Sequence, residues 1–222
     1  MSSLMHMDFH RQLGILSPDA LEDLQVTMIG AGGIGSPTVL ALAKMGVQNI
    51  KVYDADFLEK HNLPNQMYRT TDVSRPKVEA LAEVVKDYTG LVIDRVSEAY
   101  TNQPLEGVVI SGVDSMAARK EIWKQVQGQS FRVPLYIEAR MGAEVARIYT
   151  VDPEDTLQCE WYEEFLYSDE QAQNVPCTER AIIYCTFMIA SLLASQVKKY
   201  VTGGNLCGEI IFDMVTLSVY AE

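Results

Sequence analysis

The sequence predicts an α/β protein with a doubly wound, mainly parallel sheet and a C-terminal antiparallel extension. Three observations indicate this fold class. An apolar, β-prone run at 26–29 meets a glycine-rich turn and then a helix-period pattern. Strand-like and helix-like segments alternate from there to Leu135, which is typical of a parallel sheet with helices on both faces. After a long apolar helix, two short apolar runs at 210–213 and 216–220 predict an antiparallel hairpin that closes the sheet.

The glycine-rich turn has the spacing Gly30-x-Gly32-x-x-Gly35. In this fingerprint one glycine makes the tight turn, one lets the backbone approach a phosphate, and one lets the helix pack closely on the strand. The following helix offers free N–H groups and a positive dipole end to that phosphate. A second strand-like run, 49–53, leads to Asp54. This acid follows the last glycine at about the sequence spacing expected for a residue that binds the ribose. Together these features predict an adenine nucleotide site in a Rossmann-like fold.

The other elements follow from apolar periodicity and from boundary signals. The residues up to about Gly14 resemble an arm, and Ser17-Pro18 begins a short helix. A polar loop at 57–71 precedes a helix that opens at Arg75-Pro76-Lys77. Further strands are expected at 91–96, 107–112, 135–137 and 144–151, with an amphipathic helix after the fourth strand.

We expect a single domain over residues 1–222, because the chain shows neither an internal repeat nor a linker. A chain of this length with 48% apolar residues buries enough surface to fold without disulfides or metal. The expected parts are an N-terminal arm and helix (1–24), a nucleotide-binding core (25–151), an acidic crossover loop (152–178), and a C-terminal helix and hairpin (179–222).

Composition excludes several classes of partner and site. The chain has 18 basic and 30 acidic side chains, a net charge of −12, which argues against a nucleic acid or an anionic membrane as partner. Its four cysteines form no C-x-x-C pair, so neither zinc nor a disulfide framework is expected. No signal-peptide pattern opens the chain and no segment is long enough to span a bilayer, so we expect a cytoplasmic protein with reduced thiols.

Polar side chains that follow the predicted strands should gather at the carboxyl edge of the sheet, where open α/β sheets bind ligands. They are Asp54, Asn62, Gln66, Arg69, Lys77 and Asp114. Two cations, two carboxamides and two acids exceed what NAD requires and suit a triphosphate with Mg²⁺. Spacing alone leaves Asp114 open between a metal ligand and a helix cap, and a lone lysine such as Lys77 is more often a surface residue.

A series of short motifs runs in order from Asp8 to the C-terminus. They are Arg11-Gln12, 30–35, Asp54-Ala55-Asp56, Asn62 with Gln66, Pro76-Lys77, Val113-Asp114-Ser115 with Arg119, Cys177 and Ile211-Phe212-Asp213. This series resembles the ThiF/MoeB family, bacterial relatives of ubiquitin-activating enzymes. The resemblance implies ATP-dependent adenylation of a C-terminal carboxylate, usually that of a ubiquitin-like β-grasp protein ending in Gly-Gly. The carboxylate would attack the α-phosphate and expel Mg-pyrophosphate, which requires positioning and charge stabilisation.

The resemblance also implies roles for single residues. Gly33 would lie beneath the phosphates, and Asp114 would bind Mg²⁺. Arg11 would reach into the site of a neighbouring subunit, which implies a homodimer. The candidate catalytic residues are Arg11, Lys77, Asp114 and Cys177. The candidate nucleotide-binding residues are Gly30, Gly32, Gly33, Gly35, Asp54 (ribose), Asp56, Asn62 (triphosphate), Asn65, Gln66, Arg69, Lys77 (triphosphate), Asp114 and Ser115.

Cys177 carries a second hypothesis, because some family members have a cysteine there that takes over the activated acyl group. A thiolate attacks an acyl-adenylate readily, since AMP is a good leaving group, and a position before a helix favours the thiolate. The alternative is a small apolar residue that closes the loop after Pro176. Cys185 should lie in the core, and Cys159 and Cys207 should be structural.

Other functions stay open, because the glycine motif also allows NAD and because one departure from the family pattern supports a non-catalytic subunit. Relatives commonly have Asn-x-x-Arg-Gln where this chain has Asn62-Leu63-Pro64-Asn65-Gln66, and Arg69 or Arg75 are the candidates to replace the missing arginine. The alternatives are a non-catalytic subunit of a heteromeric activating complex and an NAD-dependent oxidoreductase. A tRNA-modifying dehydratase of the same family is a third, which the acidic composition disfavours.

Overall fold

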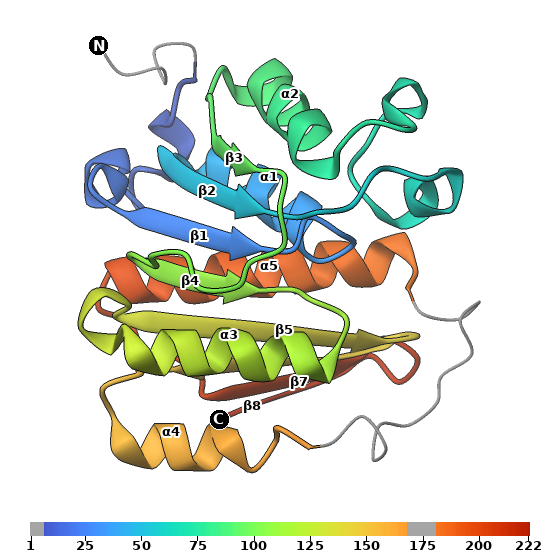
Figure 1. The fold of residues 1–222 in the computed structure, drawn as a ribbon. Coiled ribbons are helices and arrows are strands. Elements are labelled where there is room, and N and C mark those ends of the chain that lie inside the picture. The colour runs from blue at the N-terminus through green and yellow to red at the C-terminus, as the bar shows by residue number, and fades with distance from the viewer. Residues whose placement is uncertain (1–6, 168–180) are drawn as a thin grey trace.

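The computed structural model describes residues 7–167 and 181–222, which build one eight-stranded sheet with helices on both faces (Figure 1). The strand order is β3-β2-β1-β4-β5-β6-β7-β8. The strands are β1 (Gln25–Ile29), β2 (Asn49–Tyr53), β3 (Asp94–Val96), β4 (Val108–Ser111), β5 (Leu135–Gly142), β6 (Val145–Val151), β7 (Glu209–Asp213) and β8 (Ser218–Ala221). The α-helices are α1 (Gly35–Met45), α2 (Lys77–Thr89), α3 (Met116–Gly128), α4 (Thr156–Glu163) and α5 (Ile183–Val201).

The pairing of the strands confirms the predicted fold class. Strands β3, β2, β1, β4 and β5 are parallel, whereas β6, β7 and β8 add to the sheet in antiparallel fashion. From β1 the chain first winds outward through β2 and β3 and then returns to β4 on the other side of β1. The order therefore reverses between β1 and β4, and in such folds ligands bind at this switch point.

The core consists of two apolar clusters, one on each face of the sheet. Met28 of β1 belongs to the cluster that includes residues of α1, α2 and α5, while the next residue, Ile29, belongs to the cluster that includes Ile122 of α3 and Tyr162 of α4. Successive residues of a strand point to opposite faces, so the apolar run in β1 serves both clusters. The same two layers of helices are visible on the two sides of the sheet in Figure 1.

The crossover segment 152–178, predicted as a loop, contains the helix α4 in its described part. Asp155 caps this helix, since its side chain accepts hydrogen bonds from two backbone N–H groups of the first turn. Cys159 and Tyr162, three residues apart, are buried against the sheet, while the acidic residues around them face outward. The prediction of a loop was therefore wrong for residues 156–163, because the acidic composition made a short amphipathic helix hard to recognise.

Smaller differences concern the bounds of the elements. The third strand is only Asp94–Val96, and the fifth extends to Gly142 because its hairpin with β6 continues the pairing to Val145. The short helix after Ser17 is a 3₁₀ helix, and the polar loop 57–71 contains 3₁₀ turns at Lys60–Asn65 and Thr70–Asp72. None of the helices in 7–167 and 181–222 has the length and hydropathy of a membrane span.

Replacing Gly35 by alanine should strongly destabilise the protein. An added Cβ would lie 1.8 Å from the carbonyl oxygen of Gly30, so α1 would have to move away from β1. We expect a loss of at least about 2 kcal/mol in the free energy of unfolding, measured by urea denaturation. The control is Gly128→Ala, at the end of α3, where nothing lies within 4 Å of the added atom. Equal stabilities of the two variants would contradict the close approach.

Candidate functional site at the glycine turn

The glycine turn 30–35 is held at the switch point by its neighbours. Gly30 has a φ of 98°, a conformation that favours glycine, and its N–H donates to the carbonyl of Tyr53 at 2.8 Å. The buried hydroxyl of Ser36 donates to the carbonyl of Gly32 at 2.8 Å. No side chain of the described residues caps the first turn of α1. The N–H of Ser36 donates to the carbonyl of Gly32 and Pro37 has no N–H, so in this turn the N–H of Gly35 is left for a ligand.

Gly32 stands beside open space. Apart from its chain neighbours, a Cβ added there would meet only one group of the described residues, the side-chain nitrogen of Gln66 at 4.0 Å, and the φ of Gly32 lies outside the left-handed region. Gly33 is tighter, because a Cβ would lie 3.3 Å from Thr186 and 3.4 Å from the carbonyl of Asn65. Neither backbone conformation nor packing thus requires a glycine at position 32. The close approach of a phosphate would require one, as at the second glycine of the fingerprint.

Asp54 fastens the turn to the end of β2. One carboxylate oxygen accepts the N–H of Ala31 at 2.7 Å and the other accepts the N–H of Asp56 at 2.8 Å. Burial raises the pKa of Asp54, although the hydrogen bond from Ala31 and the charge of Lys77 act in the opposite direction. Because a carboxylate has about four acceptor positions, Asp54 retains capacity for ribose hydroxyls, and its predicted ribose contact stays a prediction.

Lys77, the first residue of α2, is only 7% exposed. Its ammonium donates to the carboxylate of Asp56 at 2.6 Å, and its backbone N–H donates to the carbonyl of Asp56 at 2.9 Å. The low exposure shows that the interpretation of Lys77 as a surface residue was wrong. Lysines are rarely buried unless they are paired, and here Asp56 is the partner. The structure brings a buried cation to the same edge as Asp54, as the triphosphate hypothesis requires.

The loop after β2 presents carboxamides near the turn. Asn62 accepts the N–H of Glu59 at 2.9 Å and so caps the 3₁₀ turn Lys60–Asn65. The side-chain oxygens of Asn65 and Gln66 are buried and have no hydrogen-bond partner among the described residues. Since buried polar atoms are normally satisfied, these two amide groups have unused capacity for a ligand.

The same loop is fastened to the turn by two further hydrogen bonds. The hydroxyl of Tyr68 donates to the carbonyl of Ala31 at 2.6 Å, and the N–H of Met67 donates to the hydroxyl of Ser36 at 3.1 Å. Both bonds join positions more than thirty residues apart in the chain. These bonds hold the backbone next to Gln66 against the glycine turn.

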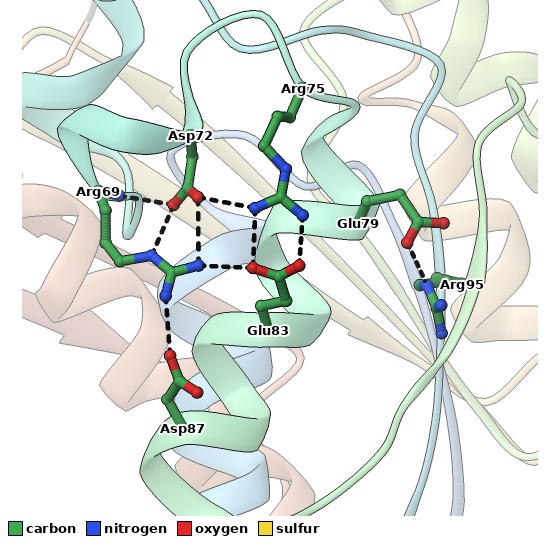
Figure 2. Close-up of polar contacts among 7 residues, drawn as sticks. All are labelled: Arg69, Asp72, Arg75, Glu79, Glu83, Asp87 and Arg95. Atoms are coloured by element: carbon green, nitrogen blue, oxygen red, sulfur yellow. Dashed lines mark hydrogen bonds and ion pairs between the residues drawn. The ribbon is translucent and has the colours of Figure 1, made fainter.

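Arg69 and Arg75 are engaged elsewhere, as Figure 2 shows. Arg69 pairs with Asp72 at 3.0 Å, Glu83 at 2.9 Å and Asp87 at 2.8 Å. Arg75 pairs with Asp72 at 3.1 Å and with Glu83 at 2.5 Å. Carboxylates of the loop and of α2 thus neutralise both guanidinium groups, and the predicted contact of Arg69 with the nucleotide stays a prediction. The sequence analysis did not identify the buried Asp72 as the shared partner of these arginines. The available signal was its position three residues from each of them.

Asp114 follows β4 at the switch point, and its exposed carboxylate makes no hydrogen bond or ion pair with the described residues. The cap of α3 is Ser115, whose hydroxyl accepts the N–H of Ala118 at 3.2 Å, so the interpretation of Asp114 as a cap was wrong. Within 7–167 and 181–222, no group of three or more His, Cys, Asp or Glu side chains could hold a metal. A magnesium ion at Asp114 would therefore need phosphate oxygens and water as its other ligands, which is usual for Mg²⁺.

Arg11 lies far from the glycine turn of its own chain. It is exposed on the 3₁₀ turn His10–Gln12, and the neighbouring Gln12 donates to the carbonyl of Met45 at 2.8 Å. Met45 ends α1, whereas the glycine turn begins it. With 11 residues the helix is about 16 Å long, too far for the Arg11 side chain to span.

The cysteines divide into described and undescribed ones. Cys177 lies outside the described residues, so its predicted role stays a prediction. Cys159, Cys185 and Cys207 are free thiols. Burial raises the pKa of Cys159 and of Cys185, which opposes thiolate formation at both.

Two surface hollows lie at the other edge of the sheet, where β1, β2 and β4 begin. Their volumes are about 430 and 580 Å³. They are remote from the glycine turn, because that turn lies at the opposite ends of the same strands. Open α/β sheets bind ligands at the carboxyl ends of their strands, so we place the site at the turn.

Comparison with known proteins defines the class. The ThiF family model matches residues 7–212, and the chain belongs to the ThiF family. The NEDD8-activating enzyme E1 catalytic subunit of Arabidopsis thaliana is 33% identical over 117 residues, covering 48% of this chain and 25% of that protein. The sulfur carrier protein ThiS adenylyltransferase of Escherichia coli is 32% identical over 110 residues, covering 46% and 44%. The matches thus span less than half of the length of either relative.

Solved structures agree with this fold. A crystal structure of PaaA has a TM-score of 0.72 and 19% identity, covering 92% of this chain and 65% of that one. A structure of E. coli MccB with AMPCPP and MccA has a TM-score of 0.73 and 16% identity, with the same coverage. At such identities the likeness shows the fold.

Asp72→Asn should lower the free energy of unfolding at pH 7 by about 2 kcal/mol, because two arginines would lose a buried partner. Burial alone would raise the pKa of Asp72, but hydrogen bonds from the Arg69 side chain and backbone outweigh it and lower that pKa. The ionised form therefore stabilises the fold above the ordinary value of 3.8, and this contribution is lost as pH falls through the lower folded-state value.

Urea denaturation of the wild type and Asp72→Asn at pH 7 and below pH 3.8 checks this expectation, since the difference should shrink in acid. The control is Glu79→Gln, which breaks the exposed pair with Arg95 in Figure 2 and should cost at most about 0.5 kcal/mol at either pH. A stability difference for Asp72→Asn that does not change with pH would contradict the ionic role.

Proposed function

We propose that this protein uses ATP to adenylate the C-terminal carboxylate of a small ubiquitin-like protein ending in Gly-Gly. One observation carries the proposal: among the described residues, the carboxyl edge combines an open cradle at Gly32, a buried ammonium at Lys77 and an unpaired carboxylate at Asp114. A phosphate cradle, a cation and a free acid suit a triphosphate with its magnesium ion. Membership of the ThiF family supports the proposal, as do the adenylyltransferases among its named relatives.

The residues of the turn and loop would hold the nucleotide. Phosphates would lie over Gly32 and the first turn of α1, with Lys77 as a further donor, whereas the amide oxygens of Asn65 and Gln66 would accept hydrogen bonds. When bound, Mg²⁺ at Asp114 would neutralise charge on the pyrophosphate that leaves. Asp54, which holds the turn, would also hold the ribose.

The proposed reaction needs no covalent participation of the protein. An oxygen of the substrate carboxylate forms a bond to the α-phosphorus while the bond from that phosphorus to the bridging oxygen breaks. The products are an acyl-adenylate and pyrophosphate, and no proton is transferred because the carboxylate is already ionised. The chain contributes orientation and positive charge, chiefly from Lys77. A second step, attack of the Cys177 thiolate on the acyl carbon with loss of AMP, belongs to the proposal as a hypothesis.

We also propose a homodimer in which Arg11 completes the site of the partner subunit. Two observations support it: Arg11 is too far from its own glycine turn, and its exposed side chain makes no hydrogen bond or ion pair with the described residues of its own chain. Helix α5 presents Tyr184 and Phe187, both exposed, as apolar surface for such a contact. The cytoplasmic location predicted from the sequence stays a prediction.

Asp114→Ala should reduce ATP–pyrophosphate exchange at least about 100-fold, because the metal would lose its protein ligand. Exchange is measured with a panel of ubiquitin-like proteins ending in Gly-Gly. The exposed, unpaired Asp114 makes unchanged thermal stability the expected companion result. Asp23→Ala, an exposed acid before β1, is the control and should retain full exchange. Wild-type ATP binding without exchange would contradict catalysis and favour the non-catalytic subunit, a role consistent with the pairing of Arg69 and Arg75 with carboxylates of their own chain.

Mixing Arg11→Ala with Lys77→Ala should restore activity that neither variant has alone. In a mixed dimer one site receives Lys77 from one chain and Arg11 from the other, and is therefore intact. Random exchange of subunits makes about half of the dimers mixed, so about a quarter of wild-type exchange is expected. As a control, Arg11→Ala is mixed with a chain that carries both substitutions, which should restore nothing. An arm acting within its own chain predicts no recovery in the first mixture.

A further inference from the structure

Glu138 of β5 is a fully buried carboxylate on the sheet face covered by α3 and α4. Arg140 donates two hydrogen bonds to it, at 2.6 and 2.7 Å. Arg119 of α3 forms an ion pair with it at 2.7 Å, and the hydroxyl of Tyr162 donates to it as well. Oε1 thus accepts a hydrogen bond from Arg140 and faces Arg119 in an ion pair, in which Nε of Arg119 makes no hydrogen bond with the described residues. Oε2 accepts hydrogen bonds from Arg140 and Tyr162, so three hydrogen bonds and two positive charges offset the cost of burying this group.

Arg119 connects this carboxylate to the backbone beside Asp114. The side chain of Arg119 is buried, with 8% of the residue exposed. Its Nη2 donates to the carbonyl of Val113 at 2.5 Å. Val113 directly precedes Asp114, whose own side chain contacts none of the described residues. The position of the Asp114 carboxylate is therefore set by its backbone, and Arg119 holds that backbone.

Arg140 makes the corresponding connection on the other side. Its guanidinium donates to the carbonyl of Phe165 at 2.8 Å and lies 4.7 Å from the ring centre of Tyr149. Phe165 follows the C-terminal end of α4. One carboxylate therefore orients two arginines, and each arginine holds a backbone carbonyl at the end of a separate element.

Burial of a carboxylate with two arginines is a weak source of stability, because the desolvation cost offsets much of the attraction. The arrangement instead fixes the orientation of the arginine side chains. Each guanidinium is planar, and it faces Glu138 with one edge and a backbone carbonyl with another. We propose that Glu138 is a positioning residue for the turn 112–115 that carries Asp114, acting through Arg119. Through Arg140 it fixes the end of α4 in the same way. The metal aspect of this inference rests on the proposed function.

Hydrogen exchange of the nucleotide-free protein tests the positioning. The N–H groups of Gly112 and Ala118 report on the turn, because they are bonded to Ile29 and to Ser115. Those of Phe165 and Leu166 report on the end of α4. Glu138→Gln should accelerate exchange about tenfold or more at both places.

Variants of the two arginines test the connection through Arg119 and the connection through Arg140 separately. Arg119→Gln should accelerate exchange at Gly112 and Ala118 only, and Arg140→Gln at Phe165 and Leu166 only. Should Glu138→Gln not fold, these two variants still decide the question. Uniform acceleration across the sheet in either of them, or none at its reporters, would overturn the proposal.

A magnesium titration of ATP binding supplies the functional readout. The Mg²⁺ concentration for half-maximal binding should rise about fivefold or more in Glu138→Gln and Arg119→Gln, and should not change in Arg140→Gln. Glu163→Gln is the matched control, because Glu163 accepts hydrogen bonds from Trp123 and Gln127 and so joins α4 to α3 without touching Glu138. An equal rise in the control would overturn positioning by Glu138. If the wild type binds no Mg-ATP, the proposed function fails, while the exchange pattern still decides the role of Glu138.

Discussion

The close approach of α1 to β1 at Gly35 is the constraint on which the rest of the structure depends. With no Cβ at Gly35, the first turn of α1 can lie against the carbonyl of Gly30. This contact places the uncapped start of α1 at the switch point of the sheet, beside the open space at Gly32. Asp54 then holds the turn from β2, so the geometry of a phosphate cradle follows from backbone contacts.

Charge is distributed around this turn in a consistent way. The buried charges are paired: Lys77 with Asp56, Asp72 with two arginines, and Glu138 with two others. Asp114, in contrast, is exposed and has no partner among the described residues. Pairing makes the buried groups rigid, whereas an unpaired acid at the switch point keeps its capacity for a cation. This contrast separates groups that shape the site from a group that would bind there.

Local signals carried the sequence prediction, and long-range contacts limited it. The order of strands and helices and the glycine turn could be predicted because apolar periodicity and glycine spacing are local. Helix α4 was missed because it depends on burying Cys159 and Tyr162 against the sheet from an acidic segment. The burial of Lys77 depends on Asp56, 21 residues away, and the engagement of Arg69 on acids of α2. Such partners become visible only when the loop is folded.

The central claim is that phosphates of ATP lie over Gly32. Calorimetric titration of the wild type and Gly32→Ala with Mg-ATP, and separately with NAD, tests it most directly. The account predicts that the wild type binds Mg-ATP and not NAD. It also predicts that the added methyl group weakens binding at least about tenfold with unchanged thermal stability, because the nearest described atom beyond the adjoining residues, on Gln66, would lie 4.0 Å away. Binding of NAD alone, or equal ATP affinity of the two proteins, would contradict the account.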